Sequence, residues 1–154
     1  MAEPLIKVEQ LIKHYATRSS VVKALDGISL EVFPGEIVAV VGESGSGKTT
    51  LANLILGTEQ ASSGSLKFQN QVLNMKRPLE LRRQIQYVQQ NPMTTLNPRR
   101  TIFQSVRVPL QTHSVGNTQE QRKRVADLLE LVGMSRDYLD RAPSALSGGQ
   151  RQRV

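Results

Sequence analysis

The chain of 154 residues has no cysteine, no tryptophan, and only three phenylalanines and three tyrosines. The absence of cysteine excludes a disulfide scaffold and a thiolate metal site. So few aromatic side chains offer little surface for stacking bases, which argues against direct binding of nucleic acid. No run of about 18 apolar residues occurs, so no membrane-spanning helix is predicted.

The length and composition of the chain indicate a globular protein of one domain. Hydrophobic residues make up 38% and charged residues 21% of the sequence, which is typical of such proteins. The N-terminus, Met1-Ala2-Glu3-Pro4, lacks the basic and apolar regions of a signal peptide. Twenty Lys and Arg against 13 Asp and Glu give a net charge of +7. We interpret this excess, the Arg122-Lys123-Arg124 run included, as solvated helix faces, with a nucleic-acid partner as the alternative.

The first half of the sequence predicts mainly strands. Residues 5–15 and 21–32 are each expected to form one, with Asp26-Gly27 as a turn or bulge in the second. The run Ile37-Val38-Ala39-Val40-Val41 is apolar and mostly β-branched, as in a parallel strand that is buried on both faces.

Shorter elements follow this run. A helix is expected over residues 48–56 with Gly57 as its C-cap. Residues 62–64 are expected to form a loop, and residues 65–68 with 72–73 a strand pair or hairpin. Residues 85–88 read as a short core strand.

The second half is predicted to be helical, after a loop over residues 91–100. The better marked of two helices opens at Thr118, where a Thr-x-x-Gln capping box reaches Gln121, and ends at Gly133. Its expected apolar stripe consists of Val125, Leu128, Leu129 and Val132. Pro143-Ser144 precedes a last element.

Residues 42–49, Gly-Glu-Ser-Gly-Ser-Gly-Lys-Thr, fit the pattern G-x-x-x-x-G-K-[ST] in full. Glycines at these positions let the backbone adopt positive φ and approach phosphate oxygens, so that successive N–H groups form an anion-binding nest. Lys48 supplies a charge for the β- and γ-phosphates, and the Thr49 hydroxyl can bind Mg²⁺. A simple Gly/Ser-rich turn is the alternative, but a predicted strand before the motif and a helix after it favour a nucleotide site.

Residues 146–150, Leu-Ser-Gly-Gly-Gln, would by themselves be typical of a flexible turn or a helix start. Downstream of a phosphate-binding loop, they are similar to the LSGGQ signature of the ATP-binding cassette (ABC) family, and the resemblance extends over essentially the whole chain. Residues 89–99, Gln-Gln-Asn-Pro-Met-Thr-Thr-Leu-Asn-Pro-Arg, also resemble a stretch of the oligopeptide, dipeptide and nickel importer ATPases. In this sequence Asn91 replaces the usual acidic residue and Gln89 the usual aromatic one.

The resemblance implies an α/β fold of the P-loop NTPase class, an ABC-type nucleotide-binding domain that is incomplete in this chain. It divides residues 1–154 into a β-rich part with the phosphate loop, 1–89, and a part that holds the Q-loop and helical subdomain and ends in the signature, 90–154.

The resemblance also implies the site residues. Tyr15 occupies the place of an aromatic residue that stacks on adenine, and a core aromatic is the alternative role. Gln90 occupies the place of the glutamine that joins the core to the helical subdomain, contacts Mg²⁺ and reports the γ-phosphate; a solvated loop amide is the alternative. Thr49 and Gln90 are the expected metal ligands, and Gln90 is the one expected catalytic residue. The expected ATP-binding residues are Tyr15, Gly42, Glu43, Ser44, Gly45, Ser46, Gly47, Lys48, Thr49, Thr50, Ser147, Gly148, Gly149 and Gln150.

In this family two such domains dimerise head to tail, so that Ser147 and Gly149 would contact the γ-phosphate held by a partner. The implied function is the ATP-binding subunit of an ABC transporter, which couples the binding and hydrolysis of ATP, with Mg²⁺ as cofactor, to import of a peptide-like or nickel-like solute. Its partners would be a second ATPase domain and transmembrane permease subunits, with no direct nucleic acid. The subunit would lie in the cytoplasm at the inner face of the membrane.

The family places a strand that ends in Asp-Glu, and later a histidine, after the signature, and neither follows within this sequence. His14 and His113 both precede the signature. We therefore expect a fragment that binds nucleotide without efficient hydrolysis, because an activating carboxylate is missing. The alternatives are a soluble ABC ATPase that acts on nucleic acid or ribosomes, and a non-catalytic binding fragment.

Overall fold

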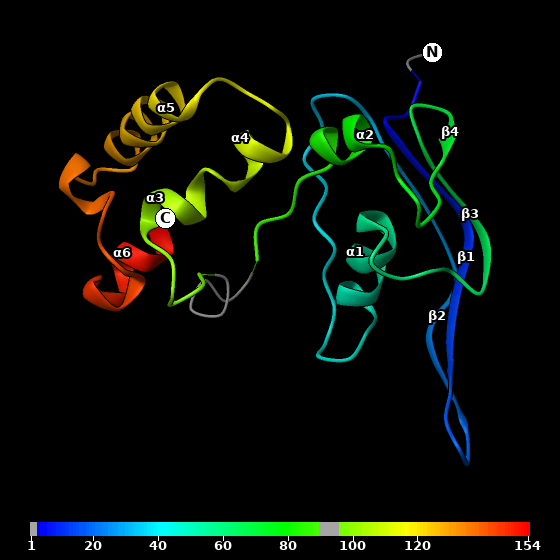
Figure 1. The fold of residues 1–154 in the computed structure, drawn as a ribbon. Coiled ribbons are helices and arrows are strands. Elements are labelled where there is room, and N and C mark those ends of the chain that lie inside the picture. The colour runs from blue at the N-terminus through cyan, green and yellow to red at the C-terminus, as the bar shows by residue number, and fades with distance from the viewer. Residues whose placement is uncertain (1–2, 90–95) are drawn as a thin grey trace. The chain divides into compact units, whose positions relative to one another are not determined.

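The structure, a computed structural model, describes residues 3–89 and 96–154. Two compact units, Met1–Tyr87 and Val88–Val154, make up the chain (Figure 1). The first unit holds a four-stranded sheet and the second is helical, which confirms the expected α/β class with a β-rich N-terminal part. The predicted division at residues 89 and 90 stays a prediction, since Gln90 lies outside the described residues.

The sheet of the first unit has the strand order β2-β1-β3-β4, and every pairing is antiparallel. Its strands are β1 (Ile6–Ala16), β2 (Val21–Val32), β3 (Ser63–Phe68) and β4 (Gln71–Val72). The two long strands and the hairpin are confirmed. The loop predicted over residues 62–64 is wrong for Ser63 and Gly64, because Ser63 pairs with Ile12 and so extends β3.

A bulge in β1 decides which side chains enter the core. The register to both neighbours shifts near Gln10, whose φ is 47°. One extra residue reverses the alternation of side chains, so that Val8 and Leu11 are both 1% exposed although they lie three positions apart. The backbone N–H of Gln10 donates to Ser29 Oγ at 2.9 Å. The predicted irregularity in β2 is a second bulge, where Ile12 pairs with Asp26, Leu11 pairs with Ile28, and Gly27 adopts a φ of 83°.

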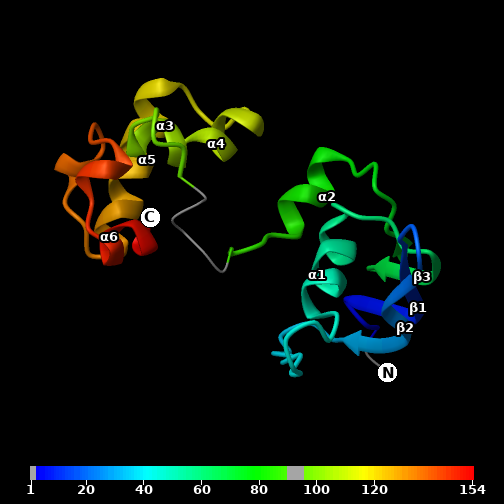
Figure 2. The ribbon, with the colours of Figure 1, turned by 90° about the horizontal axis from the view of Figure 1, so that it is seen from below.

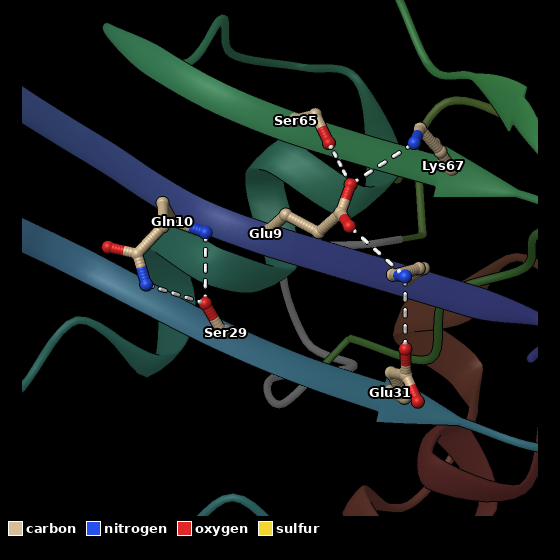
Figure 3. Close-up of polar contacts among 7 residues, drawn as sticks. Glu9, Gln10, Ser29, Glu31, Ser65 and Lys67 are labelled. Atoms are coloured by element: carbon tan, nitrogen blue, oxygen red, sulfur yellow. Dashed lines mark hydrogen bonds and ion pairs between the residues drawn. The ribbon is translucent and has the colours of Figure 1, made fainter.

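Charged side chains link the three longer strands. Glu9 of β1 accepts hydrogen bonds from Ser65 Oγ at 2.9 Å and from Lys67 Nζ at 3.1 Å (Figure 3). Lys7 bridges Glu9 at 3.1 Å and Glu31 at 3.4 Å. These partners, Ser65 foremost, lower the pKa of Glu9 from 4.5 to about 2. Hydrogen bonding and opposite charge favour the ionised carboxylate.

Helix α1 (Lys48–Leu56) covers the apolar face of this sheet, and both views show it alongside the strands (Figures 1 and 2). The core that it closes consists of Val8, Leu11, Leu25, Leu51, Leu54 and Leu66. Its bounds and its Gly57 C-cap, with a φ of 76°, confirm the sequence prediction. Arg77, which is 8% exposed, donates to the carbonyl oxygens of Ile55, Leu54 (3.0 Å) and Asn74 (2.9 Å). A buried guanidinium thus satisfies helix carbonyls that lack a partner within α1.

Two predicted core strands are wrong in the described structure. Residues 37–41 and 85–88 are not strands, and side chains of both runs are exposed: Ile37 is 97%, Val41 91% and Val88 92% exposed. A strand exists only through a hydrogen-bonded neighbour, and the sheet of the described residues has none for either run. Apolar composition indicates a tendency toward burial, but it does not provide the neighbouring strand that burial requires. Between β4 and the second of these runs lies α2 (Leu79–Gln84).

The described part of the second unit contains α3 (Ile102–Val106), α4 (Val108–Thr112), α5 (Thr118–Leu131) and α6 (Gly148–Arg153), together with the 3₁₀ turns η2 (Arg136–Tyr138) and η3 (Pro143–Ala145). In the part of the chain that the structure describes, no helix is both long and apolar enough to cross a membrane. The core of this unit consists of Ile102, Phe103, Val125, Ala126, Leu129, Met134, Leu139 and Leu146.

Helix α5 begins at Thr118, as predicted, but its capping box lies one residue earlier than predicted. Its N-cap is Asn117, whose side chain accepts from the backbone of Gln119 and Glu120, and Glu120 completes the capping box at 2.9 Å. Asn at N-cap with Glu at N3 therefore prevails over the predicted Thr118 and Gln121.

The apolar stripe of α5 is half confirmed. Val125 and Leu129 are buried, but Leu128 is 44% and Val132 39% exposed. Arg122 is not simply solvated, since it forms a two-pronged ion pair with Asp140 and lies 5.2 Å from the centre of the Phe103 ring. Lys123 and Arg124 are exposed, as expected for the polar face of this helix.

Candidate functional site

The glycine-rich loop, residues 42–47, runs directly into α1. Gly45 has a φ of 83° and Gly47 a φ of 90°, a backbone conformation that L-residues with a side chain adopt only at a cost. A Cβ on Gly47 would lie 2.8 Å from Leu25 Cδ2 and closer still to the Ala24 carbonyl oxygen. The loop therefore follows a path against β2 that only glycine permits at this position.

Lys48 reaches back over the loop. Its Nζ donates to the carbonyl oxygens of Gly42 (2.8 Å) and Glu43 (2.6 Å) and to Ser46 Oγ (3.2 Å). The ammonium group thus lies within the curve of the loop, where a bound anion would meet both its charge and the backbone N–H groups.

The N-terminus of α1 has no side-chain cap. Its N-cap is Gly47, which has no side chain to accept a hydrogen bond from the first turn. The first N–H groups of a helix have no partner within the helix, and together with the helix dipole they favour an anion. Thr49 is exposed and Thr50 partly buried in this first turn, and Ser44 is exposed in the loop.

Tyr15 lies near the end of β1 and is 36% exposed. Its hydroxyl donates to a carboxylate oxygen of Glu59, and Lys13 Nζ lies 4.8 Å from the centre of its ring. The hydrogen bond to Glu59 raises the pKa of Tyr15, while a hydrogen bond with the Thr50 side chain acts in the opposite direction. The side chain is therefore partly solvated and tied by its hydroxyl, not enclosed in the core.

The second motif forms the start of α6. Ser147 is its N-cap and completes a capping box with Gln150: Ser147 Oγ accepts from the Gln150 backbone at 3.2 Å, and Gln150 Oε1 accepts from the Ser147 backbone at 2.9 Å. Gly148 and Gly149 have no positive φ, and a Cβ on either would meet nothing within 4 Å. Leu146 is buried in the core of the second unit.

Residues outside the motif hold this helix in place. Gln150 Nε2 donates to the Tyr138 hydroxyl at 2.8 Å, and Arg153 donates to the carbonyl oxygens of Val132 (3.3 Å) and Gly133 (3.1 Å) at the end of α5. Sequence reasoning missed Tyr138, as it missed Glu59 and Arg77 in the first unit. None of the three belongs to a motif, and their partners are far away in sequence.

The structure thus brings the predicted site residues together in two groups, one in each unit. Residues 42–50 form the loop and helix start in the first unit, which also contains Tyr15, and residues 147–150 form the α6 start in the second. Gln90 lies outside the described residues. Among the residues that are described, no group of three or more His, Asp or Glu could hold a metal ion, so the candidate ligand from the loop is the Thr49 hydroxyl.

Comparisons with known proteins identify the relatives of this arrangement. The oligopeptide transport ATP-binding protein OppF of Bacillus subtilis is 36% identical over 159 residues, which cover 100% of this chain and 52% of OppF. The chain therefore spans about half the length of this curated relative.

Solved structures give the same result for the fold. The ATP-binding cassette MJ0796, in a dimeric post-hydrolysis state bound to ADP and Pi, matches with a TM-score of 0.82 and 30% identity, over 96% of this chain and 66% of that one. CbiO1 from Clostridium perfringens, part of the ABC transporter complex CbiONQ, matches with a TM-score of 0.73 and 31% identity, over 97% of this chain and 58% of that one.

A family model described as "ABC transporter" matches residues 25–154, from the middle of β2 to the end of the chain. This match includes the glycine-rich loop and the signature, and it agrees with the two kinds of relatives. The chain belongs to the ABC transporter family.

Proposed function

We propose that the chain is the ATP-binding part of an ABC importer for a peptide-class solute, and that residues 42–50 hold the ATP phosphates. The observation that carries the proposal is the loop, with two glycines at positive φ, an uncapped helix N-terminus and the Lys48 ammonium group inside its curve. The presence of ADP and Pi in the MJ0796 cassette supports ATP as the ligand, and the similarity to OppF supports a peptide-like solute.

The residues of the loop would divide the work of binding. Phosphate oxygens would compete with the Gly42 and Glu43 carbonyl groups for the Lys48 ammonium group, and the hydrogen bond to phosphate is the stronger one because both of its partners are charged. The N–H groups of the loop and the first turn of α1 would fix the direction of the phosphates.

Mg²⁺ fits the donor set of the loop. This ion usually binds through one or two protein oxygens together with the phosphates of the substrate, and the exposed Thr49 hydroxyl is such an oxygen. When bound, the ion would neutralise charge on the β- and γ-phosphates. Gln90 is a second proposed ligand and the proposed sensor of the γ-phosphate, by resemblance alone.

The signature is proposed to act on ATP held by a second ATPase domain, in a head-to-tail dimer. Ser147 and Gly149 are both exposed at the start of α6, and the MJ0796 cassette is a dimer. Permease subunits would be the further partners, as the membership of CbiO1 in a transporter complex suggests, and the chain would act at the cytoplasmic face of the membrane.

A titration of ATP into the purified chain tests the phosphate site. Lys48→Ala should weaken ATP binding at least tenfold, because no other described cation approaches the Gly42 and Glu43 carbonyl groups, and a lost charge-assisted contact of about 1.5–3 kcal/mol corresponds to such a factor. Lys23→Ala is the matched control. Lys23 is exposed, and among the described residues its one ion pair is with Asp26, outside the loop. Equal affinities of folded Lys48→Ala and Lys23→Ala chains would refute the site.

Hydrolysis of ATP and binding of nucleic acid are tested by separate measurements. Steady-state phosphate release, with Lys48→Ala as the background, tests the prediction that the chain binds nucleotide without efficient hydrolysis. Salt-sensitive retention of RNA or DNA would favour the alternative, a soluble ABC ATPase that acts on nucleic acid. Carboxylates pair with Lys7, Arg122 and Arg136, which leaves less unpaired positive charge for a nucleic-acid partner.

A further inference from the structure

The Tyr15 ring is held by residues that the glycine-rich motif does not include. Its hydroxyl donates to Glu59, which lies just beyond the Gly57 C-cap of α1. The other carboxylate oxygen of Glu59 accepts from Asn53 Nδ2 at 3.0 Å, and Asn53 belongs to α1 itself. One carboxylate therefore connects the end of β1 to the helix that the phosphate loop opens.

The turn that carries Glu59 is itself fastened to α1. The backbone N–H of Thr58 donates to the Asn53 carbonyl oxygen at 3.0 Å, and the Thr58 hydroxyl donates to the same oxygen at 3.2 Å. Asn53 thus holds both the backbone before Glu59 and the Glu59 side chain. These hydrogen bonds place the Glu59 carboxylate, and with it the Tyr15 hydroxyl, relative to α1.

Lys13 completes this arrangement on a face of the ring. Its Nζ lies 4.8 Å from the centre of the Tyr15 ring and 3.7 Å from Glu59 Oε2, and it donates to the Gln60 carbonyl oxygen at 2.8 Å. A cation at this distance is attracted by the π-electrons of one face. Tyr15 as a whole remains 36% exposed, which leaves surface for a flat ligand to stack.

The protonation states agree with this geometry. The hydrogen bond from Tyr15 and then the one from Asn53 lower the pKa of Glu59, and the carboxylate of Glu59 raises the pKa of Tyr15. A neutral phenol that donates to an ionised carboxylate is therefore the stable pair at neutral pH.

We infer that Glu59, fastened by Asn53 and assisted by Lys13, is a positioning residue that holds the Tyr15 ring in a fixed place relative to α1, so that the base and the phosphates of one nucleotide are recognised by a single rigid piece of the chain. We call these three residues the Tyr15 anchor. The inference rests on the proposed nucleotide site. A merely structural role, in which the contacts only stabilise the end of the sheet, makes a different prediction about ligands.

Two ligands separate the roles: ATP, which has a base, and inorganic tripolyphosphate, which has none. In calorimetric titrations of the full chain, Glu59→Ala should weaken ATP binding about 3- to 10-fold, as expected when a base loses part of its stacking on an aromatic ring. Tripolyphosphate binding should change less than about twofold, since phosphate contacts specific to the loop remain. Tyr15→Phe keeps the ring but loses the hydroxyl, and should show the same selective loss. Glu80→Ala, at an exposed Glu of the same unit, is the matched control.

A second measurement needs no ligand. The chain has three tyrosines and no tryptophan, so phenol ionisation can be followed by ultraviolet absorbance, and Tyr15→Phe identifies the Tyr15 contribution. Glu59→Gln keeps the size of the side chain and removes its charge, and should lower the pKa of Tyr15 toward its ordinary value. An unchanged pKa in this variant would overturn the inference, and this variant also serves if Glu59→Ala fails to fold.

The outcomes separate this inference from the function on which it rests. If Lys48→Ala leaves both ligands bound, the phosphate site itself is wrong. If Lys48→Ala abolishes binding of both, while Glu59→Ala weakens ATP and tripolyphosphate equally or changes neither, the Tyr15 anchor alone is refuted. Selective loss of ATP in Glu59→Ala and Tyr15→Phe, with Lys48 required for both ligands, supports it.

Discussion

The two glycine-rich motifs of the chain use glycine in different ways. In the phosphate loop, Gly45 and Gly47 adopt positive φ, and Gly47 has no room for a Cβ next to Leu25. In the signature, Gly148 and Gly149 have neither property, and space around both is open. The fold of this chain therefore requires Gly47 but makes no such demand on the signature glycines. A requirement for glycine in the signature would have to come from a surface or ligand outside this chain.

The helices that begin within the two motifs, α1 and α6, differ in how their N-termini are capped. α1 has nine residues, an uncapped N-terminus and a C-terminus that is held by Gly57 and Arg77. α6 has six residues and caps its own N-terminus through Ser147 and Gln150. Helix α1 is fastened at its C-terminus and leaves its first backbone N–H groups for a ligand. In α6, by contrast, the backbone N–H of Gln150 already donates to Ser147 Oγ.

The largest expected effect comes from Gly47→Ala, with Gly45→Ala as its matched partner. Both substitutions place a side chain at a φ near 90°, which costs about 1–2 kcal/mol in each case. Gly47→Ala adds a clash with the β2 backbone at Ala24, so we expect a total loss of about 3 kcal/mol or more in the free energy of unfolding. Urea denaturation of the two variants measures the difference. Equal losses would show that the loop can move away from β2.

An intermediate effect concerns pH and is confined to the sheet of the first unit. The pKa of Glu9 is about 2 in the folded chain and 4.5 ordinarily, so its contribution to stability is present above pH 4.5 and is lost as the pH falls through 2. The melting temperature should therefore fall over this range. Glu9→Gln should remove part of the fall, while Glu80→Gln should not. An identical acid profile for Glu9→Gln and the parent chain would contradict the network of Figure 3.

The smallest effect should have the opposite sign. Gly149→Ala places a good helix former in α6, where the space is open, and should raise the stability of the second unit by up to about 1 kcal/mol. Hydrogen exchange of the α6 amide groups can detect so small a change. A destabilised helix would mean that Gly149 is required by the fold after all, and the contrast with Gly47 would disappear.

The predictions from sequence succeeded where local chemistry decides the structure. The ends of α1 and the residues 21–32 of β2 were predicted to the residue, because Gly57 and the strand pattern are local signals. Residues 37–41 failed, since apolar β-branched composition indicates burial but does not say whether a neighbour exists. The N-cap of α5 was predicted one residue too late, because Asn117 competes with Thr118 for this position and only three-dimensional geometry decides.

For the site as well, local sequence patterns could be predicted and long-range contacts could not. Lys48 and the loop glycines form a pattern that is contiguous in sequence, so their grouping could be predicted. Glu59 reaches Tyr15 across 44 positions and Gln150 reaches Tyr138 across 12. Such contacts depend on how strands and turns are brought together, which no motif encodes.

The exposed run Ile37–Val41 also governs how the protein behaves in a concentrated solution. Its five residues carry no charge and no proline, a composition that favours cross-strand pairing between chains. Ile37 and Val41 are almost entirely open to solvent, so a strand-prone segment is accessible to other chains. Turbidity and light scattering should therefore rise steeply with protein concentration, and an added charge at Val41 should shift the onset to higher concentrations.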